Sequence, residues 1–261
     1  RLQGDWSSDV CSSDLSRPPA RPTGGSGILT DFAIDSIRRR IVKWLLLAII
    51  VYPLAMSPLL LAAGRWDWTP AYLGMAFLLT ASIIQARQIC LHNPKLFARR
   101  SQLLPEIPPW DRHLVSGLKL AVIGLLVTAG LEHRLWGEAF HPARFSLGLV
   151  LATSGLRLLH SSQKANPFFE AYVRHQKDIG QVVVDQGPYR LVRHPGYLAY
   201  LGVFASLPCL MSSNWAWLPL LLLVLLFVVR LLKEEAFLRQ NLEGYSEYCG
   251  RVRYRLVPGF W

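Results

Sequence analysis

The sequence predicts an all-α, polytopic transmembrane protein with about six membrane helices. Of its 261 residues, 52% are hydrophobic and only 17% are charged, and the mean hydropathy is +0.27. Soluble domains usually carry about 25% charged residues. The apolar residues fall in runs long enough to cross a bilayer, and the basic residues gather at alternate ends of these runs. Together these observations favour a membrane protein over one or two soluble domains.

Residues 1–27 are treated as a leader outside the fold. Residues 1–15 resemble a translated sequencing-adapter read-through, and residues 16–27 are rich in Pro, Gly and Ser. Such a segment is excluded from fold reasoning. No apolar run with a small-residue cleavage site follows it, so no cleaved secretory signal is expected.

A structural metal or a disulfide framework is not expected either. Outside the leader the chain has Cys90, Cys209 and Cys249, which show no paired spacing. The seven histidines are scattered without the i, i+3 or i+4 pairing used by metal sites on helices. The sequence therefore predicts no metal site.

Six segments satisfy the length of a membrane helix, which is roughly 20 mostly apolar residues. The first contains Pro53 and Pro58, which membrane helices tolerate. The uncharged stretch 196–229 is too long for one span, and its polar break at Ser212–Asn214 predicts a helical hairpin. The predicted helices are Ile41–Ala63, Pro70–Leu91, Leu114–Leu131, Ala143–His160, Gly196–Met211 and Trp215 to about Gln240.

Charge placement predicts the orientation of these helices. With the N-terminus in the cytoplasm, the outside connections hold three basic and three acidic residues, so the formal net charge of +11 lies entirely inside. This agrees with the enrichment of Lys and Arg in cytoplasmic loops. We therefore expect a multi-pass integral membrane protein with both termini cytoplasmic. The excess charge is explained by orientation and anionic membrane lipids rather than by nucleic acid.

The chain divides into N-terminal membrane helices over 28–160 and a C-terminal part over 161–261. The cytoplasmic segments 161–195 and 239–261 are too small to form an independent catalytic domain. Any chemistry must therefore combine these segments with the cytoplasmic ends of the helices. The connection 93–113 is interpreted as an interfacial loop.

Two polar concentrations are candidate sites. The segment 166–197 is dense in polar and turn residues, and its Pro195 suits a first helical turn whose free N–H groups attract an anion. A membrane-surface loop that contacts lipid headgroups is the alternative. On the sixth helix Arg230 and Glu234 share a face, with Glu235 beside them. Ionisable groups at a membrane boundary indicate function, although a solvated helix end is also possible. The tail 244–261, rich in Arg and aromatic residues, is typical of an interface anchor.

A series of motifs runs in order through the last hundred residues. They are Asn166-Pro-Phe168-Phe169, Val173-Arg174-x-Gln176, Gln181–Val184, Gly187–Tyr197, Arg230-x-x-x-Glu234-Glu235, and Gly244-Tyr245-x-x-Tyr248 followed by Arg253–Gly259. In this order and spacing, the chain resembles the isoprenylcysteine carboxyl methyltransferase family. The four N-terminal helices match that family only as hydrophobic spans.

The resemblance implies S-adenosylmethionine as methyl donor, in a cytoplasmic-facing pocket that the C-terminal segment closes. Residues 161–261 would then be the methyltransferase core. Backbone and ring contacts would come from 181–184 and Tyr189, the start of the fifth helix would hold the amino-acid end, and Arg230 would face the acceptor. The implied cofactor-binding residues are Arg174, Gln176, Gln181, Val182, Val183, Val184, Tyr189, His194, Pro195, Gly196, Tyr197, Glu234 and Glu235, and the implied catalytic residues are Arg230 and Glu234.

The resemblance also implies a lipid-like or prenylated small-molecule acceptor. A carboxylate acceptor would pair with Arg230 and need no general base. An amine, as in phospholipid N-methylation, would need a base such as Glu234, Glu235 or His194. The family often has His where this chain has Gln181, which puts a side-chain contact to the donor in doubt. Together with the adapter-like start, the family variant suggests a bacterial inner-membrane protein.

Two other functional classes are considered beside the methyltransferases. NADPH-dependent sterol reductases share a similar Arg-His-Pro motif and Gly-x-x-Tyr-x-x-Tyr tail, but they are usually longer. A non-enzymatic transporter or scaffold would place ionisable residues near the bilayer midplane. Here they lie at the predicted cytoplasmic ends. No GxGxxG, GxxxxGK[ST], HExxH or GxSxG motif supports a soluble-enzyme site.

Overall fold

The computed structural model describes residues 52–92, 107–137 and 140–261, and within them the chain is all-helical with no β-strand. The leader, the first part of the predicted helix 41–63 and most of the connection 93–113 lie outside the described residues. The long helices are α2 (Thr69–His92), α4 (Pro109–Trp136), α5 (Pro142–Ala165), α6 (Pro195–Leu210) and α7 (Trp217–Asn241), and a further helix covers Tyr52–Ala63. Short helices are η1 (Lys177–Ile179), η2 (Gly187–Arg190) and α8 (Tyr245–Arg251).

The described helices agree with the predicted ones except at a few ends. The largest differences are in α4, which begins at Pro109 rather than Leu114 and ends at Trp136 rather than Leu131, and in α5, which ends at Ala165 rather than His160. Proline fits a first helical turn because that turn has no intrahelical acceptor for its missing N–H. Asp111 in the same turn complements the positive end of the helix dipole. The last residues of the predicted interfacial loop are therefore helical.

Two of the described helices are long and apolar enough to cross a membrane, and they are Thr69–Leu91 and Pro109–Trp136. Tyr52–Ala63 and α6 are apolar but shorter. In α7 the uncharged stretch ends before Arg230, Lys233 and Glu234. The prediction of six membrane-spanning helices therefore stays a prediction beyond these two.

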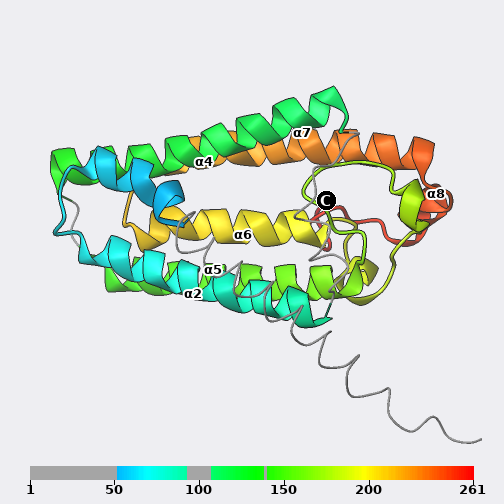
Figure 1. Cartoon of the computed structure of the whole chain (residues 1–261), viewed down its shortest axis with the longest axis horizontal. Coiled ribbons are helices and arrows are strands. Elements are labelled where there is room, and N and C mark those ends of the chain that lie inside the picture. Colours follow the sequence, from blue (N-terminus) through cyan, green and yellow to red (C-terminus); the bar gives the residue numbers. More distant parts are fainter. Residues whose placement is uncertain (1–51, 93–106, 138–139) are drawn as a thin grey trace, which may run out of the picture. The chain divides into compact units, whose positions relative to one another are not determined.

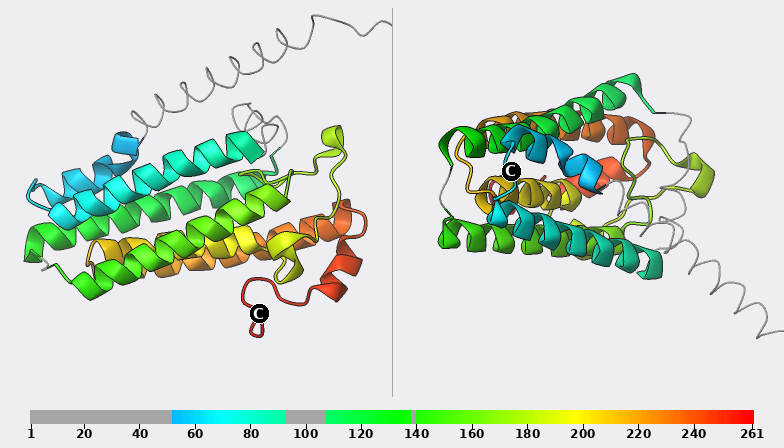
Figure 2. Two further views of the ribbon diagram at one scale, coloured as in Figure 1. Left: turned by 90° about the horizontal axis from the view of Figure 1, so that it is seen from below. Right: turned by 60° about the vertical axis from the view of Figure 1, so that its left-hand side comes forward.

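α4 packs antiparallel along α7 and α5 packs antiparallel along α6, while α2 lies beside α5 and runs in the same direction as it (Figure 1, and from other sides in Figure 2). Close packing of α5 on α6 depends on Gly155, where a β-carbon would lie only 2.8 Å from the carbonyl oxygen of Ala199. This arrangement brings the starts of α4 and α6 to the same end as the C-termini of α5 and α7. We call this the cavity end, because a cavity lies there. The opposite end holds the α6–α7 turn at residues 211–216, and we call it the hairpin end.

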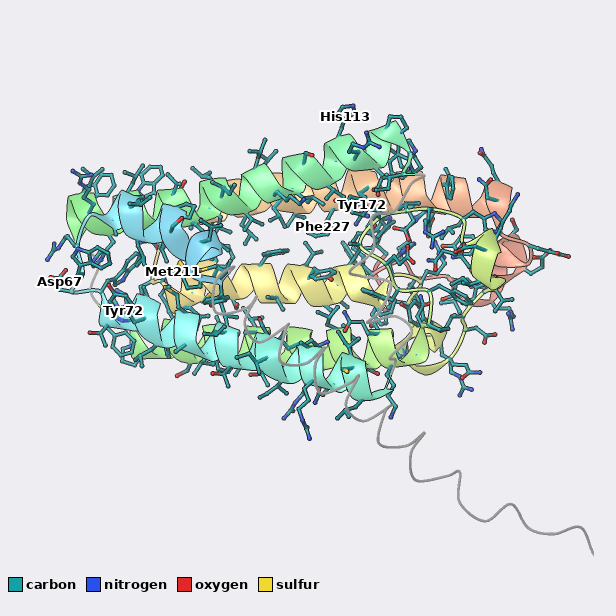
Figure 3. All side chains as sticks on the ribbon, in the orientation of Figure 1. Asp67, Tyr72, His113, Tyr172, Met211 and Phe227 are labelled. Carbon is teal, nitrogen blue, oxygen red and sulfur yellow. The ribbon has the colours of Figure 1, made fainter. Side chains whose placement is uncertain are left out.

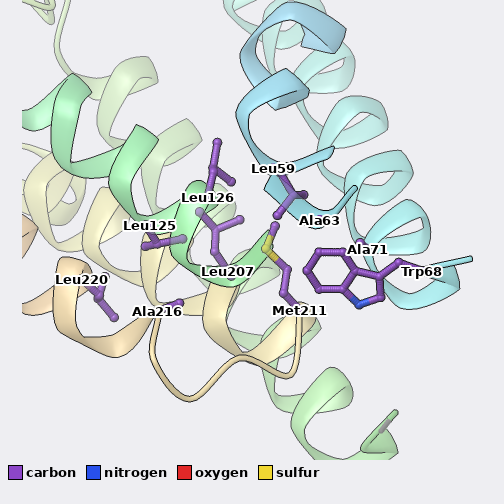
Figure 4. Close-up of a cluster of buried hydrophobic side chains, with 11 residues drawn as sticks. Leu59, Ala63, Trp68, Ala71, Leu125, Leu126, Leu207, Met211, Ala216 and Leu220 are labelled. Carbon is purple, nitrogen blue, oxygen red and sulfur yellow. The ribbon is translucent and has the colours of Figure 1, made fainter. Parts of the chain in front are cut away.

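The hairpin end contains a buried apolar core. Trp68, Leu125 and Met211 are buried there with residues from α2, α4, α6 and α7 (Figure 4). Asp67 and Met211 lie at this end, whereas Tyr172 lies toward the cavity end (Figure 3). The core therefore joins the helices at the end opposite to the polar segments.

The turn between α6 and α7 is held by one buried carboxylate. Ser212 adopts a left-handed conformation with φ of 53°. The Oγ of Ser213 and the backbone N–H groups of Asn214 and Trp215 donate to Glu132 of α4, the two N–H groups at 3.0 Å. The predicted helical hairpin with its break at Ser212–Asn214 is confirmed.

Candidate functional site

A cavity of about 430 Å³ lies at the cavity end, between α4, α6, α7, α8 and the loop that joins α5 to α6. Its volume falls in the range of small-molecule sites, roughly 300–1,000 Å³. Most residues singled out from the sequence line it. They are Arg174, Gln176, Gln181, Val182, Val183, Val184, Tyr189, His194, Gly196, Tyr197, Arg230 and Glu234, whereas Pro195 and Glu235 are not among the lining residues.

Glu234 presents a carboxylate to the cavity. Tyr197 of α6 donates a short hydrogen bond from its hydroxyl to Glu234 Oε2 on α7. No Lys, Arg or His of the described chain forms an ion pair with this carboxylate. Glu234 thus joins the two helices, and Arg230, one helical turn away, acts on its carboxylate only through space, without a direct ion pair.

Arg230 lines the cavity, but its charge is already paired. Its Nε and Nη2 donate to the two oxygens of Asp111 at 2.7 and 3.3 Å, and Nη2 also donates to the carbonyl of Ala171 at 2.8 Å. The guanidinium carbon lies 5.6 Å from the centre of the Tyr197 ring. Arg230, which the resemblance places facing the acceptor, is therefore already a partner in a buried ion pair.

Glu235 points into a separate buried network. It accepts hydrogen bonds from the Nε of Arg193 at 2.6 Å and of Arg255 at 3.0 Å, and His194 Nε2 lies 3.3 Å away. The Nη1 of Arg193 donates to the carbonyls of Val252 and Arg253. This network fixes the C-terminal tail beside the start of α6, so the contacts of Glu235 are structural.

The loop before α6 is folded by its own polar side chains. Arg174 pairs with Glu170 at 2.9 Å and with Asp178 at 2.9 Å, and the hydrogen bond that Arg174 donates to Glu170 is the main reason that its pKa is raised. Gln176 donates from its amide to the carbonyl of Phe168 at 2.8 Å, which leaves its Oε1 without a partner among the described residues. Gln181 Oε1 accepts the backbone N–H of Gln176 at 2.8 Å.

Two tyrosines form the wall between this loop and α8. Tyr189 accepts a hydrogen bond from Asn166 Nδ2 at 3.2 Å, and burial raises its pKa well above the usual range. Tyr248 donates from its hydroxyl to the carbonyl of Tyr189 at 2.8 Å. Both phenols therefore stay protonated, and α8 is held against the loop.

The start of α6 is shaped by a close contact at Gly196. A β-carbon at this position would lie 2.5 Å from the Phe169 ring. In the first turn, the N–H groups of Tyr197 and Leu198 donate to the carbonyl of His194, and Pro195 has no N–H. Of the predicted anion-binding donors, the N–H of Gly196 is the one without a protein acceptor in this turn.

Several lining residues were missed from the sequence. Tyr200 and Phe204 follow Tyr197 on one face of α6, and Phe227 of α7 packs against all three. Their helical spacing was a signal for this aromatic wall. Asp111, which pairs with Arg230 but does not line the cavity, could not be found in this way, because its partners lie far away in the sequence.

Within the described residues, no group of His, Cys, Asp and Glu could hold a metal ion. Residues 143–244 match the model of the phospholipid methyltransferase family, PEMT. The matched region spans α5, the polar loop, α6 and α7, and so covers most of the cavity walls. The match indicates a membrane methyltransferase, and it does not extend to the isoprenylcysteine-specific part of the predicted resemblance.

Proposed function

We propose that this chain is a multi-pass membrane methyltransferase that transfers a methyl group from S-adenosylmethionine to a lipid-like acceptor. The observation that carries the proposal is the cavity at the end of the bundle. It gathers residues from the loop, α6 and α7 that the sequence resemblance assigned to the donor, within a region that matches phospholipid methyltransferases. The match favours methyl transfer over the reductase and transporter alternatives.

The cavity walls suit the donor chemically. When bound, S-adenosylmethionine supplies an electrophilic methyl group on a sulfonium. The Glu234 carboxylate would attract the donor's cationic groups, and the N–H of Gly196 would meet its carboxylate. Val182, Val183 and Val184 offer apolar surface to a nucleoside. Closure by α8 and the tail would exclude water and align the reactants.

The aromatic wall gives the acceptor an apolar site. Leu118 of α4, Tyr200 and Phe204 of α6 and Phe227 of α7 line the part of the cavity formed by the helices themselves. A hydrocarbon chain would bury apolar area there. We therefore propose that the acceptor's tail lies between α4, α6 and α7 while its reactive group meets the polar loop.

The charges at the cavity favour an amine acceptor over a carboxylate. The charge of Arg230 is balanced by Asp111, so Arg230 attracts a second carboxylate less strongly than an unpaired arginine would, although its Nη1 can still donate to a ligand. The negative charge of Glu234 beside the cavity disfavours a second carboxylate. With Glu234 assigned to the donor, His194 on the cavity wall would be the base that takes the proton of an amine before methylation. Phospholipid N-methylation, the alternative considered from the sequence, is therefore the preferred form of the proposal.

The proposal is tested with labelled S-adenosylmethionine and purified protein in vesicles. One vesicle preparation contains phosphatidylethanolamine, and a second reaction supplies a farnesylated cysteine in phosphatidylcholine vesicles. Label in the phosphatidylethanolamine product is expected. Label in the cysteine ester alone would contradict the amine acceptor, and no label in either, with folded protein, would contradict methyl transfer to these lipids.

A further inference from the structure

Asp111 is the most deeply buried acid near the cavity, and it lies outside both the matched region and the motifs of the resemblance. It is in the first turn of α4 and is 0% exposed. It does not line the cavity itself. Any part it takes in chemistry must therefore pass through the groups that it holds.

Those groups come from two other segments. Asp111 accepts from Arg230 Nε and Nη2 on α7, and its Oδ2 also accepts the backbone N–H of Val173 at 2.8 Å. The neighbouring carbonyl of Ala171 takes a further hydrogen bond from Arg230. One carboxylate thus fixes a helix and a cavity loop in a single position relative to each other.

This pairing also decides which edge of Arg230 faces the cavity. Nε and Nη2 are used by Asp111 and Ala171, and no acceptor in the described chain receives a hydrogen bond from Nη1. Because the guanidinium is planar and bound along one edge, its orientation is fixed. Nη1 is the edge left for a ligand.

We propose that Asp111 is a positioning residue for methyl transfer: it sets the orientation of Arg230 toward the acceptor and holds the loop at 171–173 against α7. This inference rests on the proposed function. It assigns a reaction role to the N-terminal helices, for which the sequence motifs predict none. Asp111 forms no hydrogen bond with Gly196, Val182, Val183 or Val184, which are proposed to contact the donor.

The test is a double-mutant cycle with Asp111→Asn and Arg230→Gln. Both single variants should lower kcat/KM by about 100-fold, the scale of a misplacement near 1 Å, while affinity for S-adenosylhomocysteine stays within about twofold of wild type. If Asp111 acts through Arg230, the double variant should be no slower than Arg230→Gln alone. Turnover is measured with labelled donor and vesicles of bacterial total lipid, which leaves the acceptor open.

Glu132→Gln is the matched control, because it removes a buried carboxylate charge at the other end of the same helix. It should lower thermal stability without lowering turnover per folded molecule. If Asp111→Asn fails to fold, turnover of Arg230→Gln can still be compared with that of the double variant. The double variant leaves no unpaired buried charge, and equal turnover of the two would still support the positioning role.

Multiplicative losses in the double variant, or full turnover in folded Asp111→Asn, would overturn the positioning role. Wild-type protein that neither binds S-adenosylhomocysteine nor labels lipid would instead contradict the proposed function.

Discussion

The two ends of α4 each bury one carboxylate, and they use it differently. Glu132, 2% exposed, receives hydrogen bonds from a serine hydroxyl and two backbone N–H groups of the α6–α7 turn. Asp111, 0% exposed, receives them from Arg230 and from one loop N–H beside the cavity. Glu132 closes a structural turn next to an apolar core, whereas Asp111 belongs to a network of ionisable groups.

Unpaired polar atoms do not distinguish these ends. Counting partners among the described residues only, the hairpin end has both ring nitrogens of His133 and the Oγ of Ser212 without a hydrogen bond, and the cavity end has Gln176 Oε1 and the Tyr245 hydroxyl. His133 stacks on Trp68 with ring centroids 4.1 Å apart, which accounts for it as a packing residue. The difference that indicates function is the cavity with unpaired Glu234 on its wall.

The largest effects are expected when two adjacent carboxylates at the cavity end, Glu235 and Glu234, are replaced one at a time. Glu235→Ala should destabilise the protein by about 3–5 kcal/mol, because Arg193 and Arg255 would lose their buried partner. Glu234→Ala should destabilise less, by about 1–3 kcal/mol through the lost acceptor of the Tyr197 hydroxyl. It should weaken S-adenosylhomocysteine binding by about 100-fold, a loss of about 2.7 kcal/mol. Thermal unfolding in detergent and calorimetric titration measure the two effects. Equal effects of both variants on binding in folded protein would refute this division.

At the hairpin end, Glu132→Gln should lower stability by about 1–3 kcal/mol, because a charged acceptor of three hydrogen bonds becomes neutral. Donor affinity should not change, since the turn does not line the cavity. Thermal unfolding with and without S-adenosylhomocysteine checks this. A fall in affinity without a fall in stability would mean that the two ends are coupled.

The close contact between the loop and α6 gives an effect of similar size. Gly196→Ala should cost about 1–3 kcal/mol, because the Phe169 ring has to move. Donor affinity should also fall, since both residues line the cavity. The double variant with Phe169→Leu should recover part of the stability. If Gly196→Ala is as stable as wild type, the ring does not pack as described.

The smallest predicted effects have opposite signs within α8. Tyr248→Phe should destabilise by about 1 kcal/mol through loss of the hydrogen bond to Tyr189. Tyr245→Phe should stabilise slightly, because it removes a buried hydroxyl that has no partner among the described residues. Denaturation of the two variants side by side provides the measurement, and destabilisation by Tyr245→Phe would reveal an acceptor for that hydroxyl.

Much of the fold could be predicted because it depends on local patterns. Apolar runs and the polar break at Ser212–Asn214 predicted the helices and the hairpin, and Pro195 indicated the start of α6. The site was predictable as a group of residues, since the motifs at 174–197 and 230–234 meet at one cavity.

Pairings between distant charges could not be predicted. Arg230 and Asp111 are 119 positions apart, and nothing local to either residue indicates the other. Glu235 looked equivalent to Glu234 in sequence, but one step along a helix turns a side chain by about 100° onto a different face. It therefore meets Arg193 and Arg255 rather than the cavity.

The central claim, that the cavity binds the methyl donor, is tested most directly by calorimetric titration of the detergent-solubilised protein with S-adenosylhomocysteine and, separately, with NADP. Saturable binding of S-adenosylhomocysteine at one site, with no heat from NADP, is the predicted result. Binding of NADP alone, or of neither compound to protein that unfolds cooperatively on heating, would contradict the claim.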